Sequence, residues 1–422
     1  MKYHIIVFGC QMNIADAERV SAVLESMKYT QTANINEADL VAVVMCSVRK
    51  SAVDRVFGIV EKFKEIKKKN HGLKTILTGC VIKKDKKIFL NLFDYVIDIK
   101  DIKNISKLLG NCGSSRKSGP QTDNYLDITP KHSSKFSATV PIMTGCNNFC
   151  SYCVVPYARE REISRSSSKI ISEIKNLVKN NYREIWLLGQ NVNSYKDGKT
   201  SFPALLKIIN NIPGNFWIRF TSSHPKDFNS DVIEAMAKCE KITPYLNLPI
   251  QSGDNKILEL MNRHYTVQEY KNKIKELRKK IPDICLSTDI IVGFPGETKK
   301  QFNNTVQLFK DTKYDMAYIN KYSPRFGTAA AKLKDDVTWD EKKRREKVLN
   351  ETLKQTALEN NKKYIGKIVE VLIDSKKDGR LFGKTKEYKT IEINNDKYQI
   401  GEIIKAKITE ALAWSLRGKI IK

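Results

Sequence analysis

The chain has 422 residues, of which 41% are hydrophobic, enough to build the cores of two or three domains and to exclude a wholly disordered protein. Its 74 Lys and Arg against 47 Asp and Glu give a formal net charge of +27, which favours nucleic acid or an anionic membrane surface as a partner. A lysine-rich composition with solvated faces is the plainer alternative. No apolar run approaches the roughly 18 residues of a membrane-spanning helix, and we expect a cytoplasmic protein.

The first hundred residues alternate between strand and helix patterns. Strands are predicted at residues 3–8, 40–45, 74–77 and 94–97, and helices at 15–27, 52–68 and 101–109. Strands that alternate with helices are typical of a doubly wound parallel sheet, an α/β architecture. The stretch 111–119 has the Gly- and Ser-rich composition of a linker. We therefore predict an N-terminal domain over 1–112 and a linker over 113–136.

The alternation resumes on a larger scale in the central part of the chain. Strands are predicted at 138–143, 184–188, 217–221, 245–248, 285–292 and 316–321, with helices between them, for example at 170–179 and 266–280. About six such units are typical of a partial or complete (β/α) barrel. A charged helix is predicted at 338–361, and the predicted barrel domain spans 137–359.

The remaining residues, 360–422, have a different pattern. Short β-patterned runs are predicted at 367–373, 380–385, 389–393 and 402–408, separated by turn residues. This pattern predicts a small β-barrel of OB-like shape. With 15 Lys and Arg against 8 Asp and Glu, the segment is more basic than the chain as a whole.

One group of cysteines has the spacing of a cluster-binding loop. Nine cysteines are present, and metal binding is a better expectation than disulfides in a cytoplasmic protein. Cys146, Cys150 and Cys153 form a C-x3-C-x2-C motif after the first barrel strand. Three thiolates on one short loop suit three corners of a 4Fe–4S cluster and leave the fourth iron open, whereas structural zinc needs a fourth ligand nearby.

Three further cysteines, Cys10, Cys46 and Cys80, each follow directly on a predicted strand. The strands of a doubly wound sheet end on one edge, so the three thiols should converge there. The sequence therefore predicts a second three-cysteine cluster, against the alternative of three small buried residues. Ordinary packing or exposure is expected for the other cysteines, which are Cys112, Cys239 and Cys285.

Several segments carry a family resemblance. They are GCQMN, CSVR, TGC, CNNFCSYCVVPY, LLGQNVNSY, LPIQSG, LMNRHYT, VGFPGET and YSPRFGT. From Phe8 to the C-terminus the chain resembles the radical S-adenosylmethionine (SAM) methylthiotransferases of the MiaB type. The resemblance implies an N-terminal domain with an auxiliary 4Fe–4S cluster on Cys10, Cys46 and Cys80, and a C-terminal TRAM domain. It also implies a radical SAM barrel in which Cys146, Cys150 and Cys153 hold the SAM-cleaving cluster.

The chain departs from the usual family pattern at a few positions. Met45 stands where Asn is common, Glu160 where Gly is common, and Asn247 where His is common. Residues 81–83 also differ from the usual Met-Ala-Gln. None of these changes removes a cysteine, so they bear on the auxiliary pocket and substrate contacts rather than on the chemistry.

Candidates for cofactor contacts lie mostly at barrel strand ends, where barrel enzymes place their chemistry. They are Tyr152, Gly189, Gln190, Asn191, Arg219, Gln251 and Asp289. By the resemblance, residues 189–191 meet the SAM amino group, and residues 287–289 with the 292–297 turn form the ribose and adenine wall. An ordinary structural turn is the alternative for residues 293–296. Tyr152 is nearly as well explained as a core aromatic, and His224 as a turn cap.

Basic residues in two places are candidates for RNA contacts. They are Arg159 and Arg161, joined by Arg165, and in the C-terminal segment Lys384, Lys386, Lys389 and Arg417. The second group lies near Tyr388 and Trp414, and cations beside aromatic rings suit phosphate pairing and base stacking. A solvated loop explains the first group equally well, as a barrel core explains Trp414.

The resemblance implies an enzyme that inserts a methylthio group at carbon 2 of N6-isopentenyladenosine beside the tRNA anticodon, with SAM and two 4Fe–4S clusters as cofactors. Acid–base chemistry does not break such a C–H bond, which favours a radical from a cofactor. We expect tRNA and an external electron donor of flavodoxin or ferredoxin type as partners, and a monomer. The alternatives are methylthiolation of threonylcarbamoyl-adenosine in tRNA or of a ribosomal-protein aspartate, and a non-catalytic iron–sulfur RNA-binding protein.

Overall fold

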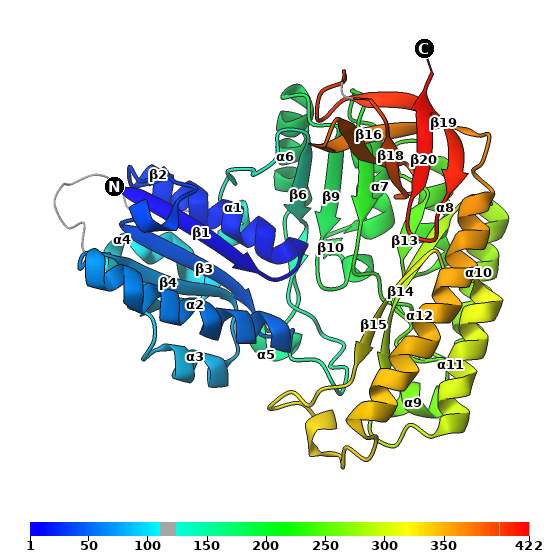
Figure 1. Ribbon diagram of the computed structural model, residues 1–422, viewed down its shortest axis with the longest axis horizontal. Helices are drawn as coiled ribbons and strands as arrows, with labels where there is room; N and C mark the ends of the chain where they lie inside the picture. Colours follow the sequence, from blue (N-terminus) through cyan, green and yellow to red (C-terminus); the bar gives the residue numbers. More distant parts are fainter. Residues whose placement is uncertain (110–123, 396, 422) are drawn as a thin grey trace. The chain divides into compact units, whose positions relative to one another are not determined.

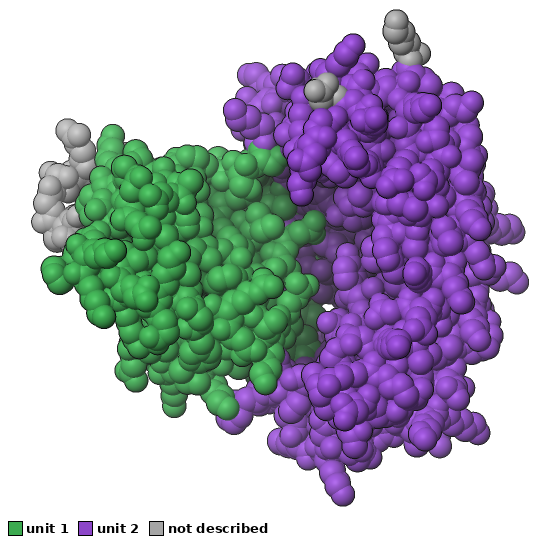
Figure 2. All heavy atoms as spheres, viewed as in Figure 1, with its two compact units in different colours: residues 1–134, 139–147, 153–173 green, residues 135–138, 148–152, 174–422 purple. Residues whose placement is uncertain are grey.

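The computed structural model describes residues 1–109, 124–395 and 397–421. The chain divides into two compact units, drawn in green and purple in Figure 2. Unit 1 consists of residues 1–134, 139–147 and 153–173, and unit 2 of residues 135–138, 148–152 and 174–422. The predicted linker stretch 111–119, with Cys112, lies outside the described residues, and the predicted domain boundaries stay a prediction.

Unit 1 is built on a five-stranded parallel sheet in the order β2–β1–β3–β4–β5 (Figure 1). Its strands are β1 (Lys2–Phe8), β2 (Thr30–Gln31), β3 (Leu40–Cys46), β4 (Lys74–Cys80) and β5 (Tyr95–Val96). Every residue of β3 is buried, because a central strand of a doubly wound sheet is covered on both faces. The apolar sequence Leu-Val-Ala-Val-Val-Met-Cys of this strand meets that requirement.

Helices connect these strands. They are α1 (Gln11–Ser26), α2 (Lys50–Lys69), α3 (Lys83–Phe89) and α4 (Ile105–Leu108). The helix predicted at 101–109 begins instead as a 3-10 segment, Ile99–Asn104, and two further 3-10 turns are Ile35–Glu37 and Tyr125–Asp127. Unit 1 also contains the short pair β7 (Met143–Thr144) and β8 (Ile163–Ser164), and the one-turn helix α5 (Val155–Ala158).

The central part of the chain forms two three-stranded sheets, ordered β12–β9–β6 and β13–β14–β15 (Figure 1). The strands are β6 (Ser137–Pro141), β9 (Glu184–Leu188), β12 (Trp217–Phe220), β13 (Tyr245–Asn247), β14 (Cys285–Val292) and β15 (Met316–Lys321). A parallel bridge between Ile218 and Ile242 links β12 to the segment that enters β13. The six strands therefore form a partial barrel, as the sequence predicts.

Helices accompany these strands, and each buries one face, which in α12 is largely polar. They are α6 (Ser167–Lys179), α7 (Phe202–Asn210), α8 (Ser230–Lys238), α9 (Asn255–Leu260), α10 (Val267–Lys280), α11 (Lys299–Thr312) and α12 (Trp339–Lys362). Short elements fill the connections: the hairpin β10 (Lys196–Asp197) and β11 (Thr200–Ser201), and the 3-10 turns Val192–Ser194 and Ala330–Lys332.

The C-terminal segment is a closed five-stranded barrel in the order β16–β17–β18–β20–β19. Its strands are β16 (Ile368–Lys377), β17 (Arg380–Thr385), β18 (Thr390–Ile393), β19 (Ile403–Ala411) and β20 (Leu416–Ile420). Alternating Val, Ile and Leu side chains fill its core. The sequence analysis missed β20, whose alternation is obscured by Arg417, Gly418 and Lys419. Closure depends on this strand, since it lies between β18 and β19.

The predicted fold class is confirmed: a parallel α/β sheet, a partial (β/α) barrel and a small C-terminal β-barrel are all present. Within the described parts of the chain, no helix is long and apolar enough to cross a membrane.

Candidate functional site

The three strand-end cysteines of unit 1 come together at one edge of its sheet. Cys46 and Cys80 are the last residues of the neighbouring strands β3 and β4 and stand opposite each other in register. Cys10 caps the N-terminus of α1, directly after β1. Cys46 and Cys80 are close enough to change each other's pKa, and Cys80 also affects the pKa of Cys10. The convergence expected from their positions in the sequence is therefore present.

Asn13 ties the three cysteine-bearing segments together. Its fully buried side chain accepts from the backbone N–H of Cys10 at 3.2 Å and from its thiol at 3.4 Å. The Asn13 amide then donates to the Met45 carbonyl at 3.2 Å and lies 3.8 Å from Cys80 Sγ. The sequence analysis did not single out Asn13, although it stands in the GCQMN segment, since a polar residue in the first turn of a helix has many ordinary explanations.

The backbone is closely packed around these thiols. Gly79 has a φ of +108°, and a Cβ built on it would stand 2.4 Å from the Met45 carbonyl oxygen, so only glycine fits before Cys80. Burial raises the pKa of Cys10. Contact with Cys80 lowers the pKa of Cys46, whereas contact with Cys46 and burial raise that of Cys80.

Arg159 lies against this thiol group, within unit 1. Its Nε donates to Cys80 Sγ, its Nη1 to the Tyr125 hydroxyl at 2.9 Å, and its Nη2 to Asp16. Burial by itself would lower the pKa of Arg159, but Asp16, Cys80 and Tyr125 outweigh it and hold that pKa well above its usual range. The side chain is fully buried, so the expected phosphate contact of Arg159 is corrected: the guanidinium serves the cysteine site instead.

The chain enters the C-x3-C-x2-C loop through a strained, crowded turn. Gly145 has a φ of +82°, and a Cβ there would stand 2.0 Å from the Arg161 carbonyl oxygen. The N–H of Cys146 donates to the Glu160 carbonyl at 3.2 Å. Glu160 itself has a φ of +63°, a backbone conformation that glycine adopts without strain. Its carboxylate pairs with Lys100.

The middle of the loop is anchored within unit 2. The Ser151 hydroxyl donates to the Leu260 carbonyl at 2.7 Å, and its backbone bonds to Met261 and Ala330. Arg263 Nη1 lies 3.3 Å from Cys150 Sγ. Burial opposes the charge of Arg263, yet Tyr152, Tyr265 and Cys150 keep its pKa well above its usual range. Cys146, Cys150 and Cys153 are all half-buried, as thiols that must reach a bound group should be.

The two cysteine sets have the chemistry that iron–sulfur clusters need. All six thiols are free of disulfides, and N–H donors of Asn13, Arg159 and Arg263 point at sulfur. No group of three or more His, Cys, Asp and Glu side chains could hold a metal ion as it stands, within residues 1–109, 124–395 and 397–421. A 4Fe–4S cluster spaces its thiolates more widely than one ion does, so the donor set still fits the cluster.

A group of buried polar atoms without partners lies after β9 and β12. They are Asn191 Oδ1, Asn193 Nδ2, Ser223 Oγ and His224 Nε2, and each lacks a hydrogen-bond partner within the described parts of the chain. A hydrogen bond joins the two loops, since the backbone N–H of His224 donates to Asn193 Oδ1 at 3.0 Å. Unpaired buried polar atoms are costly, so this group is expected to be completed by a bound ligand.

His224 is a neutral donor in this group. Burial lowers its pKa to about 2, and the charge of Arg263 adds to the effect. Because His224 Nδ1 accepts from the Lys226 N–H at 3.2 Å, the ring hydrogen is assigned to Nε2, the atom without a partner. Asn191 bonds to Asp227 at 2.7 Å through its amide nitrogen and keeps its oxygen available as an acceptor. The sequence analysis left His224 undecided between a site residue and a turn cap.

A second polar group is formed by residues of β13, of β14 and of the segment that follows β13. Asn247, the last residue of β13, donates to Ser287 Oγ at 3.1 Å and to Asp289 Oδ2 at 3.2 Å. Gln251 follows β13 with a φ of +75° and pairs by its backbone with Asp289 and Ile291. Asp289 and Gln251 are half-buried, and so is Tyr152, which packs on the apolar cluster around Met261 and Phe294.

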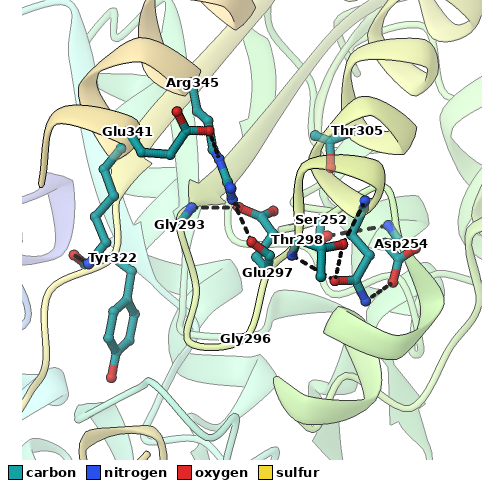
Figure 3. Close-up of polar contacts among 12 residues, drawn as sticks. Ser252, Asp254, Gly293, Gly296, Glu297, Thr298, Thr305, Tyr322, Glu341 and Arg345 are labelled. Atoms are coloured by element: carbon teal, nitrogen blue, oxygen red, sulfur yellow. Dashed lines mark hydrogen bonds and ion pairs between the residues drawn. The ribbon is translucent and has the colours of Figure 1, made fainter. Parts of the chain in front are cut away.

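The turn after β14 is held by a buried ion pair, shown in Figure 3. Glu297 Oε2 accepts from the Gly293 N–H at 2.7 Å and from Arg345 Nη1 at 2.5 Å. Burial raises the pKa of Glu297 despite these two contacts. Arg345 of α12 therefore holds the turn that is expected to contact the ribose and adenine, through its ion pair with Glu297.

Arg219, expected as a cofactor or substrate contact, has a different role in the structure. It is fully buried, with Nε 2.6 Å from Glu184 Oε1 and Nη1 3.0 Å from Thr243 Oγ1. Its remaining contacts are the carbonyls of Lys386 at 2.8 Å and Thr385 at 2.9 Å, in the C-terminal barrel. Because these contacts use its donors, we withdraw Arg219 from the candidate cofactor residues.

The expected RNA residues of the C-terminal barrel differ in exposure. Lys389 is buried and pairs with Asp315 at 2.5 Å, so we also withdraw it as a phosphate contact. Lys384 is half-buried, donates to Thr390 at 2.6 Å and lies over the Tyr388 ring. Lys386 and Arg417 reach solvent in ion pairs, with Glu370 and with Glu392 and Glu410. Arg161 is exposed.

Three family models match the chain. The Radical SAM superfamily matches residues 140–309, the uncharacterized protein family UPF0004 residues 2–99, and the TRAM domain residues 362–421. These ranges correspond to the partial barrel, the N-terminal sheet with its three cysteines, and the closed C-terminal barrel.

Solved structures share the fold at low sequence identity. The cobalamin-dependent SAM radical enzyme OxsB has a TM-score of 0.54 and 12% identity, over 83% of this chain and 56% of that one. The radical SAM methyltransferase TsrM from Kitasatospora setae has a TM-score of 0.53 and 13% identity, over 76% of this chain and 72% of that one. At such identity these likenesses show the fold alone.

Curated relatives match over the full length. The tRNA-2-methylthio-N(6)-dimethylallyladenosine synthase of Clostridium novyi is 41% identical over 100% of this chain and 96% of its own. The synthase of the same name from Carboxydothermus hydrogenoformans is 40% identical over 99% of both. Identity at this level over whole chains shows that the chain belongs to the tRNA-2-methylthio-N(6)-dimethylallyladenosine synthases, a family of radical SAM enzymes.

Proposed function

We propose that this chain inserts a methylthio group at carbon 2 of N6-isopentenyladenosine in tRNA. The observation that supports this reaction best is the presence of two separate three-thiol sets in one chain of this family. The cofactors are SAM and two 4Fe–4S clusters. Together they supply radical chemistry and a methylated sulfur, which a C–H bond without useful acidity requires.

We assign Cys146, Cys150 and Cys153 to the SAM-cleaving cluster and Cys10, Cys46 and Cys80 to the auxiliary cluster. Three thiolates leave one iron of each cluster open, and SAM and the inserted sulfur each need an open position. Arg263 holds Cys150 in place, as Asn13 holds Cys10 and Cys80. The unpaired atoms of Asn191, Asn193, Ser223 and His224 then offer both donors and acceptors to SAM or the substrate nucleoside.

The remaining candidates keep their proposed parts. Gly189, Gln190, Asn191, Gln251, Asp289 and Tyr152 line the cofactor side of the barrel. Arg161, Lys384, Lys386 and Arg417 meet tRNA phosphates, whose attraction to a chain of net charge +27 depends on salt. The target base lies in a single-stranded loop, so it can be unstacked for about a few kcal/mol. An external donor of flavodoxin or ferredoxin type, a monomer and a cytoplasmic location complete the proposal.

The test uses anaerobically reconstituted protein with SAM, a reductant and tRNA that carries N6-isopentenyladenosine. Nucleosides from the digested RNA are analysed by mass spectrometry, and we expect the methylthio product. Deoxyadenosine without this product would contradict the proposed substrate but would still show a radical SAM enzyme. A methylthio product from a parallel reaction with threonylcarbamoyl-adenosine tRNA would then identify the other tRNA target. If protein with both clusters yields no deoxyadenosine and no methylthio product, that result would contradict an enzymatic role.

The two cysteine sets are predicted to fail in different ways. A Cys146→Ala enzyme should no longer cleave SAM, because its cluster loses a ligand. A Cys10→Ala enzyme should still cleave SAM and yield deoxyadenosine, but no methylthio product. Cys239→Ala is the matched control, since this buried thiol at the end of α8 belongs to neither set and its loss should leave both products unchanged. Methylthio product from Cys10→Ala would contradict the role of the auxiliary set.

A further inference from the structure

We propose that Arg159 is a positioning residue of the auxiliary cluster, placing a fixed positive charge and an N–H···S hydrogen bond at its ligand Cys80. The inference rests on the proposed function, because it takes Cys80 as a ligand. Removing this charge should make the auxiliary cluster harder to reduce.

The guanidinium is fixed in one orientation by three different partners. Nε faces Cys80 Sγ, Nη1 donates to the Tyr125 hydroxyl and Nη2 donates to Asp16, while Tyr125 in turn donates to Asp16 at 3.3 Å. Asp16, Arg159 and Tyr125 are all buried. Buried side chains in such a closed network have little freedom to turn, so the Nε–H has a constant direction toward sulfur.

The order of charges along this network decides its effect on the sulfur. The cation directly contacts Cys80, whereas the compensating carboxylate of Asp16 bonds to the opposite side of the guanidinium. The sulfur therefore meets the positive end of the pair. Hydrogen bonds and positive charge at cluster sulfurs favour the more negative, reduced state, and buried interactions of this kind are weakly screened.

Arg159 also belongs to the same stretch of chain as the SAM-cluster motif. The backbone N–H of Arg159 donates to the Val155 carbonyl at 2.8 Å and ends the one-turn helix α5. This helix begins at Val155, two residues after Cys153. The backbone that carries Cys153 thus continues directly to the side chain that touches Cys80. The alternative is that the buried Arg159–Asp16 pair only stabilises unit 1. In that case the potential of the cluster should not depend on the sign of the charge that is removed.

The experiment isolates the auxiliary cluster in the full chain. A Cys146→Ala/Cys150→Ala/Cys153→Ala parent is reconstituted anaerobically, its iron and sulfide are counted, and the cluster's midpoint potential is measured by electron paramagnetic resonance. Arg159→Gln and Arg159→Lys are then added to this parent, and so is Asp16→Asn. Arg19→Gln is the matched control, a buried arginine of the same unit that donates to the Ala15 and Leu126 carbonyls.

We expect opposite shifts from the two halves of the pair. Arg159→Gln should lower the reduced-to-oxidised ratio at a fixed potential about tenfold, a fall of ~59 mV for one electron. Arg159→Lys should shift the potential less, and Asp16→Asn should raise it, because it removes a negative charge. The Asp16→Asn/Arg159→Gln variant leaves no unpaired buried charge. Its midpoint potential should lie below that of Asp16→Asn alone. This comparison still tests the effect of the Arg159 charge if the single Arg159→Gln variant does not fold.

Three results would overturn the inference. Shifts of the same sign from Arg159→Gln and Asp16→Asn would show a structural effect only. An Arg19→Gln shift as large as that of Arg159→Gln would show that any buried arginine suffices. A parent that binds no cluster at all would overturn the assignment of Cys80, and with it the proposed function of the auxiliary set.

Discussion

The histidine at position 224 changes charge between the unfolded and folded chain. Its pKa falls from the ordinary 6.5 to about 2 on folding, chiefly through burial. Below pH 6.5 the His224 imidazole is therefore protonated in the unfolded chain but not in the folded chain. The free energy of unfolding falls as the pH falls from 6.5 toward 2. The loss amounts to about 2 kcal/mol at pH 5, from ~1.36 kcal/mol for each pH unit.

Replacing this side chain should remove that pH dependence. A His224→Gln protein is expected to lose about 2 kcal/mol less than the wild type between pH 7 and pH 5, measured by urea unfolding at both values. His132→Gln is a useful comparison, since this second histidine lies 3.1 Å from a Glu18 carboxylate oxygen. Equal losses in the wild type and in His224→Gln would contradict a neutral, buried histidine.

The backbone at Glu160 is strained. Its φ of +63° costs a residue with a side chain on the order of 1 kcal/mol, and the exposed pair with Lys100 returns less than that. Glu160→Gly is expected to raise the free energy of unfolding by up to about 1 kcal/mol, measured by urea denaturation. Glu160→Ala keeps the strain without the carboxylate and should be no more stable than the wild type. A Glu160→Ala protein as stable as Glu160→Gly would contradict a backbone cause.

At the scale of elements, a single arginine of β12 joins the partial barrel to the C-terminal barrel. Arg219 contacts Glu184 of β9, Thr243 before β13, and two carbonyls at the end of β17 and just after it. The rings of Trp186, Trp217 and Tyr388 lie around its guanidinium. Three elements therefore depend on one buried cation.

Arg219→Met should loosen this junction. It leaves Glu184 buried and unpaired, which typically costs about 3–5 kcal/mol, and it frees the Thr385 and Lys386 carbonyls. We expect limited proteolysis to release a C-terminal fragment, detected by mass spectrometry. Glu184→Gln/Arg219→Met removes the unpaired charge and should restore part of the resistance. Unchanged proteolysis of the single variant would show that the barrel is held by other contacts.

At the scale of the whole molecule, the excess of positive charge predicts how tRNA binding responds to salt. Each phosphate contact contributes about 0.9 to the slope of log affinity against log salt for duplex nucleic acid, and about 0.7 for single strands. Lys386→Gln/Arg417→Gln should therefore weaken tRNA binding and flatten the slope by about 1.4–1.8, measured by filter binding at several salt concentrations. Lys64→Gln is the control, an exposed lysine of α2 paired with Glu61. An equal change in Lys64→Gln would indicate net charge rather than a surface.

Local pattern predicted the architecture well, and partners distant in sequence explain where it failed. Cys10, Cys46 and Cys80 converge because strand ends in a parallel sheet share one edge, which the alternation of elements already implies. Arg159 and Lys389 look like free cations in the sequence, because their carboxylate partners stand 143 and 74 residues away. Asn191 and His224 differ again: their unpaired atoms become visible only when the loops after β9 and β12 are brought together.

The place of β20 in the C-terminal barrel has a consequence for the synthesis of the chain. β20 lies between β18 and β19, and its pairing with β18 is the one parallel contact in that barrel. Until residues 416–420 have left the ribosome, β18 and β19 each present an open edge, and open edges invite pairing with other nascent chains. A chain that is cut short before Leu416 is therefore expected to aggregate rather than to persist as a nearly complete competitor for tRNA.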